Sequence, residues 1–166
     1  MIASILILAL VTFERLVELP IARRNSRVLL AQGGREHASA HYGLIVLVHV
    51  AWLATLWWLA PAEPVHLFWL IIFLIVEIGR IWVLASLGRR WTTRIITVPG
   101  EQLVRRGPYR WINHPNYCVV ALEIAVLPLV FGLWRTALVF SLLNAAILAV
   151  RIHEEDLALG RHTSGH

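Results

Sequence analysis

Five apolar stretches dominate the sequence, and each is close in length to a membrane span. A helix needs about 20 predominantly apolar residues to cross the hydrocarbon core of a bilayer. The stretches are Ile2–Leu19, Gly43–Ala60, Val65–Leu87, Pro115–Phe131 and Trp134–Val150. Because backbone polar groups must be satisfied inside each span, we expect these stretches to be helices. The sequence therefore predicts an all-α, polytopic integral membrane helical bundle with about five transmembrane helices.

The connections and the composition agree with a single membrane domain. The last two stretches are joined by Gly132 and Leu133 alone, which predicts a tight hairpin of two helices. No Ser/Gly-rich linker divides the chain, so we predict one domain over residues 1–166. Hydrophobic residues make up 58% of the chain and charged residues 15%, whereas soluble domains have about 45–50% and about 25%.

The basic residues are all arginine, and most of them lie in two connections. The first connection holds Arg23, Arg24, Arg27 and Arg35, and the third holds Arg89, Arg90, Arg94, Arg105, Arg106 and Arg110. Loops rich in basic residues face the cytoplasm. We therefore expect the N-terminus outside and the C-terminus in the cytoplasm, with a cytoplasmic loop and tail that bind any water-soluble ligand. Basic residues clustered between apolar runs do not indicate nucleic-acid binding, which needs an exposed basic face.

The cysteine count and the missing motifs exclude several classes of site. Cys118 is the only cysteine, which excludes an internal disulfide and a multi-thiolate metal site. The sequence contains no G-x-G-x-x-G, no Walker loop and no H-E-x-x-H. We therefore expect no metal centre and no soluble dinucleotide-binding fold.

The start of the fourth stretch is rich in polar and aromatic residues. Pro115 is favoured at the first position of a helix and biases His114 away from helical geometry. His114 or Asn113 then lies at the mouth of the helix, where free N–H groups and the helix dipole favour an anion. With two tyrosines and a tryptophan nearby, this mouth could hold an aromatic, zwitterionic ligand. The alternative is an ordinary helix start with interfacial aromatic residues.

The end of the fifth stretch carries a second polar group. Arg151 precedes Glu154 and Glu155 by three and four residues, so the three side chains share one face of a helix. This face is expected beside the mouth of the fourth helix. The alternative is an ion pair at a solvated helix end, which contributes only a few tenths of a kcal/mol.

Ionisable residues inside the spans form a third set. Glu77 and Arg80 are three residues apart and can neutralise each other, whereas Glu123 lies two turns into the fourth helix. Ionisable groups at this depth face a protein interior or a wet cavity and are candidates for function. We expect functional roles for Arg80 and Glu123. A structural role is expected for Glu14, Arg15 and Glu18, which are predicted to lie near the inner end of the first span.

Taken in order, these residues resemble the isoprenylcysteine carboxyl methyltransferase family of integral membrane enzymes. The similarity extends from about residue 78 to 159. It is carried by Arg80, Leu87-Gly88, Trp91-Thr92, Leu103-Val104, Gly107-Pro108-Tyr109, His114-Pro115-Asn116-Tyr117 and Arg151-x-x-Glu154-Glu155.

The resemblance implies S-adenosyl-L-methionine as methyl donor, bound on the cytoplasmic side. The residues that match the family's cofactor segments are Leu103, Val104, Gly107, Tyr109, His114, Pro115, Tyr117, Glu154 and Glu155. Arg80 and Arg151 match arginines near the reacting group. Glu123 is a candidate for taking or sharing a proton of the acceptor.

The expected activity is O-methylation of a lipophilic acceptor, namely a carboxylate, phenol or hydroxypyrone with an alkyl or prenyl chain. The resemblance is closer to a small bacterial branch, which implies a bacterial plasma membrane and a polyketide synthase product such as an alkylpyrone or alkylresorcinol. Two alternatives stay open: a membrane-embedded NADPH-dependent sterol-type reductase, and a small transporter or structural membrane protein without enzymatic activity.

Overall fold

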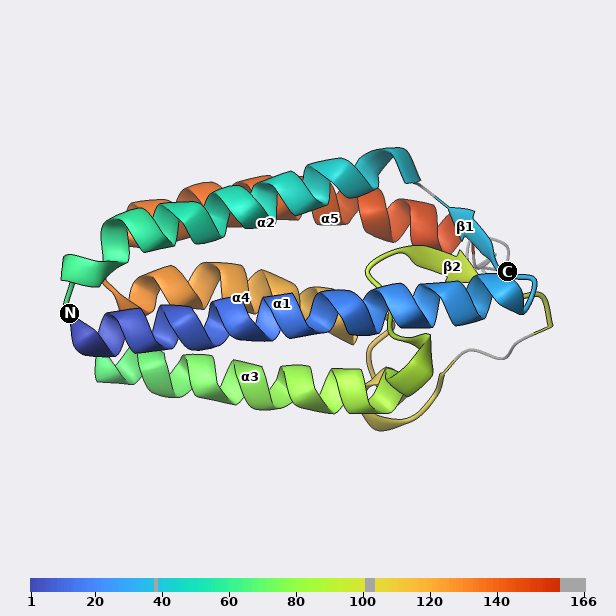
Figure 1. Ribbon diagram of the computed structural model, residues 1–166, viewed down its shortest axis with the longest axis horizontal. Helices are drawn as coiled ribbons and strands as arrows, with labels where there is room; N and C mark the ends of the chain where they lie inside the picture. Colours follow the sequence, from blue (N-terminus) through green and yellow to red (C-terminus); the bar gives the residue numbers. More distant parts are fainter. Residues whose placement is uncertain (38, 101–103, 159–166) are drawn as a thin grey trace.

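The structure is a computed structural model that describes residues 1–37, 39–100 and 104–158. Its helices are α1 (Ile2–Ala31), α2 (Ser39–Leu59), α3 (Leu67–Leu87), α4 (Pro115–Val130) and α5 (Trp134–Ala158). Three short 3-10 helices, η1 (Ala60–Ala62), η2 (Gly88–Arg90) and η3 (Gly107–Arg110), lie between them. The five long helices run alternately in opposite directions along the long axis of the molecule (Figure 1). The predicted all-α helical bundle is confirmed.

The polar connections gather at one end of the bundle, which we call the loop end (Figure 1). Strands β1 (Arg35–His37) and β2 (Ile95–Thr97) pair there in antiparallel register, with Glu36 opposite Ile96. The end of α1, the start of α4 and the end of α5 lie at this same end, whereas Met1 and η1 lie at the opposite end. Both arginine-rich connections are thus at one end, as five alternating helices require.

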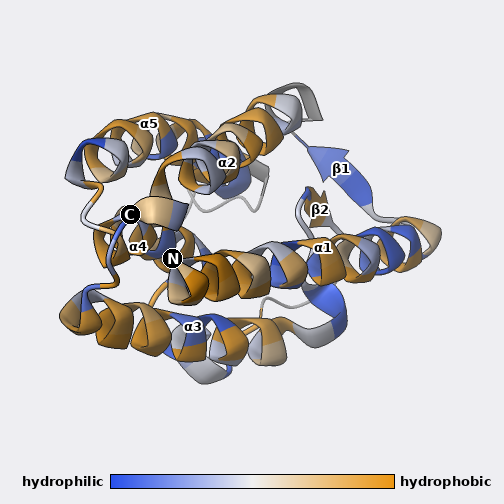
Figure 2. Ribbon diagram, turned by 60° about the vertical axis from the view of Figure 1, so that its left-hand side comes forward, coloured by the Kyte–Doolittle hydropathy of each residue, from blue (hydrophilic) through white to orange (hydrophobic). Residues whose placement is uncertain are grey.

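The helices have the length and composition of membrane spans. Three segments of the described chain are long and apolar enough to cross a membrane: Tyr42–Ala62, Leu67–Arg90 and Trp134–Leu157. Helix α4 is also apolar but shorter, at 16 residues, and α1 has 30 residues with charged side chains near its middle. Hydrophobic residues predominate along the helices, while β1 is hydrophilic (Figure 2). The chain is therefore an integral membrane helical bundle.

Helix α4 is the most buried helix and organises the core. Its residues Ile124, Leu127 and Val130 are fully or almost fully buried. They belong to one apolar cluster with residues of the other helices, including Leu8, Val11, Trp52, Leu56 and Phe73. Large apolar side chains on the outer faces of the surrounding helices stay exposed, as lipid-facing positions do. Glu123, which is 4% exposed, therefore points into protein and not into lipid.

Two helices extend beyond their predicted ends. The predicted stop of the first span at Leu19 is wrong, because α1 continues through Pro20 to Ala31. This extension is held at the loop end, where Asn25 Nδ2 donates to the backbone oxygen of Trp91 at 2.8 Å. Helix α5 likewise continues past Val150 to Ala158, because its last turns contact the start of α4.

Candidate functional site

Two polar clusters lie inside the bundle, and α4 contributes to both. The loop-end cluster is formed by side chains from the first turn of α4 and the last turns of α5: His114, Tyr117, Arg151, Glu155 and Asp156. The buried charge cluster lies near the middle of α1, α3 and α4: Arg15, Glu18, Glu77, Arg80 and Glu123. The first cluster contains residues of the predicted cofactor set, and the second contains Arg80 and Glu123.

The start of α4 positions the aromatic part of the loop-end cluster. His114 is the N-cap residue, and Pro115 occupies the first turn, as predicted. The Tyr117 amide donates to the His114 carbonyl at 3.1 Å. This turn stacks the two side chains, with ring centroids 5.4 Å apart and planes 14° from parallel. The histidine and the tyrosine of the motif thus form one aromatic surface at the helix mouth.

Arg151 connects α5 to both α4 and the loop before β2. Its Nε donates to the Tyr117 hydroxyl at 2.9 Å, and its Nη2 donates to the Thr93 carbonyl at 2.7 Å. The guanidinium carbon also lies 5.5 Å from the centroid of the Tyr117 ring, within the range of a cation–π contact. Arg151 was expected to face Glu154 and Glu155 along its own helix, but its hydrogen bonds go to Tyr117 and Thr93 instead.

Two carboxylates of α5 flank the histidine. Asp156 Oδ1 lies 3.1 Å from His114 Nε2, and Glu155 Oε2 lies 3.6 Å from His114 Nδ1. The Tyr117 hydroxyl donates to the Glu155 carboxylate. Sequence reasoning missed Asp156, although it is the third acidic residue of the run that begins at Glu154. Glu154 is half-buried, and among the described residues it takes no part in these contacts.

The short helix η3 brings Tyr109, a further motif residue, close to Glu155 of the loop-end cluster. Tyr109 packs against Val76, Val83 and Val119. Burial, with a smaller effect of the Glu155 negative charge, raises the pKa of Tyr109, which therefore stays a neutral phenol. Val104 is half-buried beside this segment, and the predicted cofactor residue Leu103 lies outside the described residues.

Gly107 is required by its conformation and by its neighbours. Its φ of +57° favours glycine, and a Cβ there would lie 2.0 Å from Ser86 Oγ. The adjacent Arg106 Nε donates to the Ser86 carbonyl at 2.7 Å. The glycine thus lets the loop lie directly against α3, which fixes the position of Tyr109.

We expect Gly107→Ala to lower the thermal unfolding midpoint of the detergent-solubilised protein. The added methyl group has no space, and overpacking of this kind costs about 1–3 kcal/mol. Gly33→Ala is the matched control, because Gly33 has a φ of +85° with nothing within 4 Å of the added Cβ. Gly33→Ala introduces backbone strain without a steric clash. Equal thermal unfolding midpoints for the two variants would therefore contradict the steric argument.

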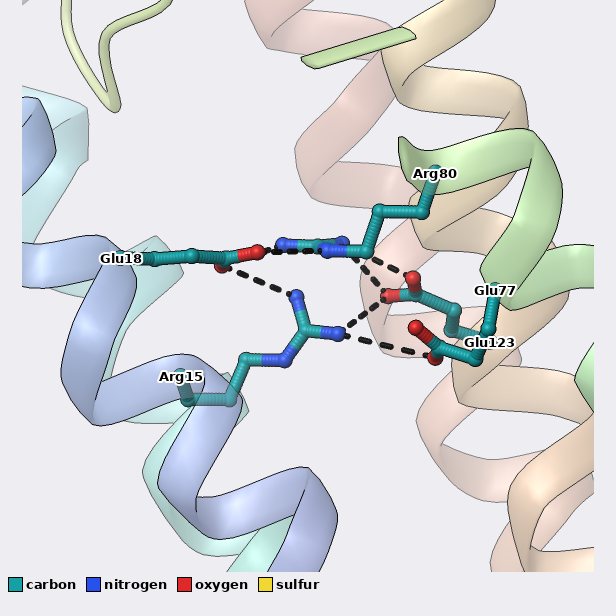
Figure 3. Close-up of polar contacts among 5 residues, drawn as sticks. All are labelled: Arg15, Glu18, Glu77, Arg80 and Glu123. Atoms are coloured by element: carbon teal, nitrogen blue, oxygen red, sulfur yellow. Dashed lines mark hydrogen bonds and ion pairs between the residues drawn. The ribbon is translucent and has the colours of Figure 1, made fainter. Parts of the chain in front are cut away.

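The buried charge cluster is centred on Arg80 (Figure 3). Arg80 Nε donates to Glu18 Oε1 at 2.7 Å, and its Nη2 donates to Glu18 Oε2 at 2.5 Å. Its Nη1 lies 2.9 and 2.8 Å from the two oxygens of Glu123. All three guanidinium nitrogens of Arg80 therefore donate to protein carboxylates, one from α1 and one from α4.

Arg15 completes this cluster from α1. Its Nη1 lies 3.2 Å from Glu18 Oε2, and its Nη2 lies 3.3 Å from Glu123 Oε2. The same Nη2 lies 3.8 Å from Glu77 Oε1. Glu18 and Glu123 are thus shared by both arginines, while Glu77 lies at the edge of the cluster (Figure 3).

The ion pairs of the buried charge cluster differ from the Glu77–Arg80 pair expected along α3. Arg80 reaches across the bundle to Glu18 and Glu123, and Glu77 faces Arg15. Arg15 and Glu18 were expected near the inner end of a short span, but the extension of α1 to Ala31 places them near mid-helix. The signal in the sequence was a pair of opposite charges inside an apolar run, and ionisable residues of this kind face the interior of a bundle.

Helix α4 connects the two clusters. Glu123 follows Tyr117 by six residues, which corresponds to about 9 Å along a helix axis. A ligand that binds at the mouth of α4 and extends into the bundle would therefore approach the buried charge cluster. Within the described residues, no group of three or more His, Cys, Asp or Glu side chains could hold a metal ion.

Comparisons with known proteins place this architecture in a family. The model of the isoprenylcysteine carboxyl methyltransferase (ICMT) family matches residues 69–161, which is more than half of the 166 residues. This region includes most of α3, all of α4 and α5, and the loop-end cluster.

Two relatives match nearly the whole chain. "Uncharacterized protein YpbQ" of Bacillus subtilis (strain 168) is 37% identical over 171 residues, covering 95% of this chain and 97% of the relative. An "Uncharacterized protein" of Haemophilus influenzae is 28% identical over 155 residues, covering 87% of this chain and 88% of the relative. No solved structure matches the chain. The ordered motifs, the membrane bundle and these matches agree, and the chain belongs to the isoprenylcysteine carboxyl methyltransferase family of membrane methyltransferases.

Proposed function

We propose that this protein is an S-adenosyl-L-methionine-dependent O-methyltransferase that acts on a lipophilic acceptor. The observation that carries the proposal is the loop-end cluster, where His114 and Tyr117 of α4 meet Glu155 and Asp156 of α5. These elements are far apart in sequence, and the fold brings their polar side chains to the mouth of one helix.

The chemistry of this cluster fits the methyl donor. S-adenosyl-L-methionine carries an ammonium group, a carboxylate, a sulfonium and a purine, and it supplies a methyl group on the sulfonium. Glu155 and Asp156 offer negative charge for the cationic groups, and the aromatic surface of His114 and Tyr117 suits a cation or a purine. The N-terminus of α4 favours a carboxylate.

Within this proposal the donor-binding residues are those of the matching motifs together with Asp156. The set comprises Leu103, Val104, Gly107, Tyr109, His114, Pro115, Tyr117, Glu154, Glu155 and Asp156. His114 and the acidic residues hold the donor, whereas Gly107 and Pro115 set the backbone around it. Arg151 orients Tyr117 and the loop at Thr93 through its hydrogen bonds, and Arg80 and Glu123 lie deeper, toward the acceptor.

The fold suits a reaction between a water-soluble donor and a membrane-dissolved acceptor. We propose that the loop end faces the cytoplasm of a bacterium, so that the donor enters from water and the acceptor enters from the bilayer. Alignment of the two reactants supplies much of the barrier reduction in such a transfer, and exclusion of water strengthens electrostatic positioning. Lipid-tailed polyketide synthase products, such as alkylpyrones or alkylresorcinols, are the acceptors that we propose to test first.

Binding of the donor is the direct test. We expect S-adenosyl-L-methionine and S-adenosylhomocysteine each to raise the thermal unfolding midpoint of the detergent-purified protein in a saturable way, because a ligand of the folded state stabilises it. His114→Ala is expected to abolish this shift. His66→Ala is the matched control, since His66 is exposed at the opposite end of the bundle.

Two outcomes would contradict the proposal. One is a folded protein whose midpoint is unchanged by either compound, and the other is a shift that His114→Ala leaves intact. A saturable shift with NADPH and none with S-adenosyl-L-methionine would favour a membrane reductase instead.

A further inference from the structure

Helix α2 carries a histidine close to both polar clusters. His49 lies ten residues from the start of α2, and Glu123 lies eight residues from the start of α4. Both helices begin at the loop end (Figure 1), so the two residues lie at similar depth in the bundle. The charges of Arg15 and Glu123 in the buried charge cluster, and of Arg151 in the loop-end cluster, all act on the His49 ring.

The hydrogen bond of His49 fixes which of its ring nitrogens can act as a base. Nδ1 lies 2.8 Å from the backbone oxygen of Ile45. A carbonyl oxygen only accepts hydrogen bonds, so Nδ1 carries the hydrogen and donates it. The neutral ring then has its lone pair on Nε2, and Nε2 makes no hydrogen bond within the described residues. His49 therefore offers a basic nitrogen whose tautomer is set by its own helix.

Trp52 adds an unpaired hydrogen-bond donor to the same face of α2. It follows His49 by three residues, and residues three apart on a helix are neighbours on one face. Its indole Nε1 is buried and has no hydrogen-bond partner in the part of the chain that the structure describes. Its side chain belongs to the apolar cluster with Leu8 of α1 and Ile124 of α4. This face of α2 therefore points toward two of the helices that carry the buried charge cluster.

The two side chains together suit a hydroxyl group. Buried polar atoms are almost always hydrogen-bonded, so the unpaired indole N–H indicates a partner that is not part of the chain, either water or a ligand. A hydroxyl oxygen can accept from Trp52 Nε1 while its proton is donated to His49 Nε2. Neither residue lies in the region that the family model matches, residues 69–161. This pair is therefore separate from the motifs by which the chain was assigned to its family.

We propose that His49 is the general base of methyl transfer, and that Trp52 positions the acceptor oxygen beside it. This inference rests on the proposed function. The acceptor hydroxyl gives its proton to His49 Nε2 as its oxygen forms a bond to the methyl carbon of the donor. The bond from that carbon to sulfur breaks, and sulfur keeps the electron pair. The proton later leaves His49 to water.

Glu123 is less suited to be the base. Both of its oxygens accept hydrogen bonds from Arg80 Nη1, and Oε2 also lies 3.3 Å from Arg15 Nη2. A carboxylate held in this way would lose ion pairs on taking a proton. His49 Nε2 can take a proton without breaking a hydrogen bond to any described residue, and the negative charge of Glu123 then stabilises the imidazolium.

The first test compares His49→Asn with the unchanged protein. Asparagine can keep the hydrogen bond to the Ile45 carbonyl through its amide nitrogen, but it cannot act as a base. A general base contributes about 10²–10⁴-fold to rate. With an alkylphenol as probe acceptor near pH 7, we expect kcat to fall by about this factor while the thermal shift with S-adenosylhomocysteine is retained. His66→Asn, at the opposite end of the bundle, is the matched control.

Two readouts separate the loss of a base from a structural effect. The activity of His49→Asn is expected to rise as the pH approaches about 10, where a phenol ionises in water. The charged groups that face His49 are Arg15 of α1, Glu123 of α4 and Arg151 of α5. In a second variant, His49→Ala, the smaller side chain leaves space for added imidazole. We expect imidazole and methylimidazoles to restore activity in the order of their basicity.

Trp52→Phe tests the positioning role. It removes the indole donor and keeps an aromatic ring in the apolar cluster. Loss of one hydrogen bond to the acceptor is expected to raise KM for the alkylphenol about 2- to 10-fold, with a smaller effect on kcat than His49→Asn has. An unchanged KM would exclude Trp52 from the site.

Several results would overturn the role of His49. They are an unchanged kcat in His49→Asn, a loss that neither higher pH nor added imidazole restores, and the disappearance of the S-adenosylhomocysteine shift in this variant. If the unchanged protein shows that shift but methylates no hydroxyl acceptor, this inference fails alone. If it shows neither the shift nor any turnover, the proposed function fails with it.

Discussion

Replacing Arg80 with leucine is expected to destabilise the protein by about 3–5 kcal/mol, the range measured when one partner of a buried ion pair is removed. Glu18 and Glu123 would each lose the closest of their arginine contacts. Arg15 alone would then face three carboxylates within an apolar part of the bundle. The expected result is a much lower thermal unfolding midpoint in detergent, and less folded protein recovered from membranes.

Two further variants show whether unpaired buried charge causes the loss of stability expected for Arg80→Leu. Arg89→Leu removes an exposed arginine from η2 and should leave the midpoint nearly unchanged. The double variant Arg80→Leu/Glu18→Leu leaves Arg15 with Glu123 and Glu77 as its partners, and it should recover part of the lost stability. Buried ion pairs replaced by apolar residues are often neutral or stabilising. An Arg80→Leu protein that unfolds at the same temperature as the unchanged protein would contradict the role of this cluster in stability.

Arg151→Leu is expected to lower kcat/KM for methyl transfer by about 10²-fold, because small displacements of positioned groups cost about this much. The substitution removes the hydrogen bonds to the Tyr117 hydroxyl and to the Thr93 carbonyl. Tyr117 and the loop before β2 would then lose the contact that holds them to α5. The measurement is the steady-state rate with an alkylphenol acceptor, together with the thermal shift produced by S-adenosylhomocysteine.

The contribution of the Arg151 hydrogen bonds to activity can be separated from the contribution of its positive charge. Arg151→Lys keeps the charge but cannot make both bonds in the same geometry, so we expect its activity to lie between those of the unchanged protein and Arg151→Leu. Arg135→Leu, at the opposite end of the bundle, should leave the rate unchanged. Full activity in Arg151→Leu would show that the contact with Thr93 and Tyr117 has no part in catalysis.

The membrane bundle was predictable because the length and apolarity of each stretch are local properties of the sequence. Each helix must satisfy its own backbone in lipid, so the apolar run from Trp134 predicts a helix whatever its neighbours are. The same is true of the start of α4, where Pro115 restricts the residue before it and His114 becomes the N-cap. The ends of α1 and α5 were less predictable, because contacts made by Asn25 and Tyr117 hold those extensions in place.

The pairing of charges required the tertiary structure. Spacing along α3 suggested that Glu77 and Arg80 pair with each other, but side chains on adjacent helices offered Arg80 closer partners in Glu18 and Glu123. Asp156 was missed for the same reason, since its partner His114 lies 42 residues away in sequence. Spacing within one helix contains no information about which side chains a second helix presents to it.

The sequence by itself determined that this protein is a helical membrane protein, that its polar motifs fall at one end, and which family it resembles. Those properties depend on hydrophobic runs, proline and arginine placement and motif order, all of which are local in the chain. Only the tertiary structure decided that Glu18 and Glu123 share Arg80, and that Glu77 lies beside Arg15 instead. Ion pairs and hydrogen bonds form only over a few ångströms. Their partners therefore depend on how α1 packs against α3 and α4, which the sequence of each helix does not specify.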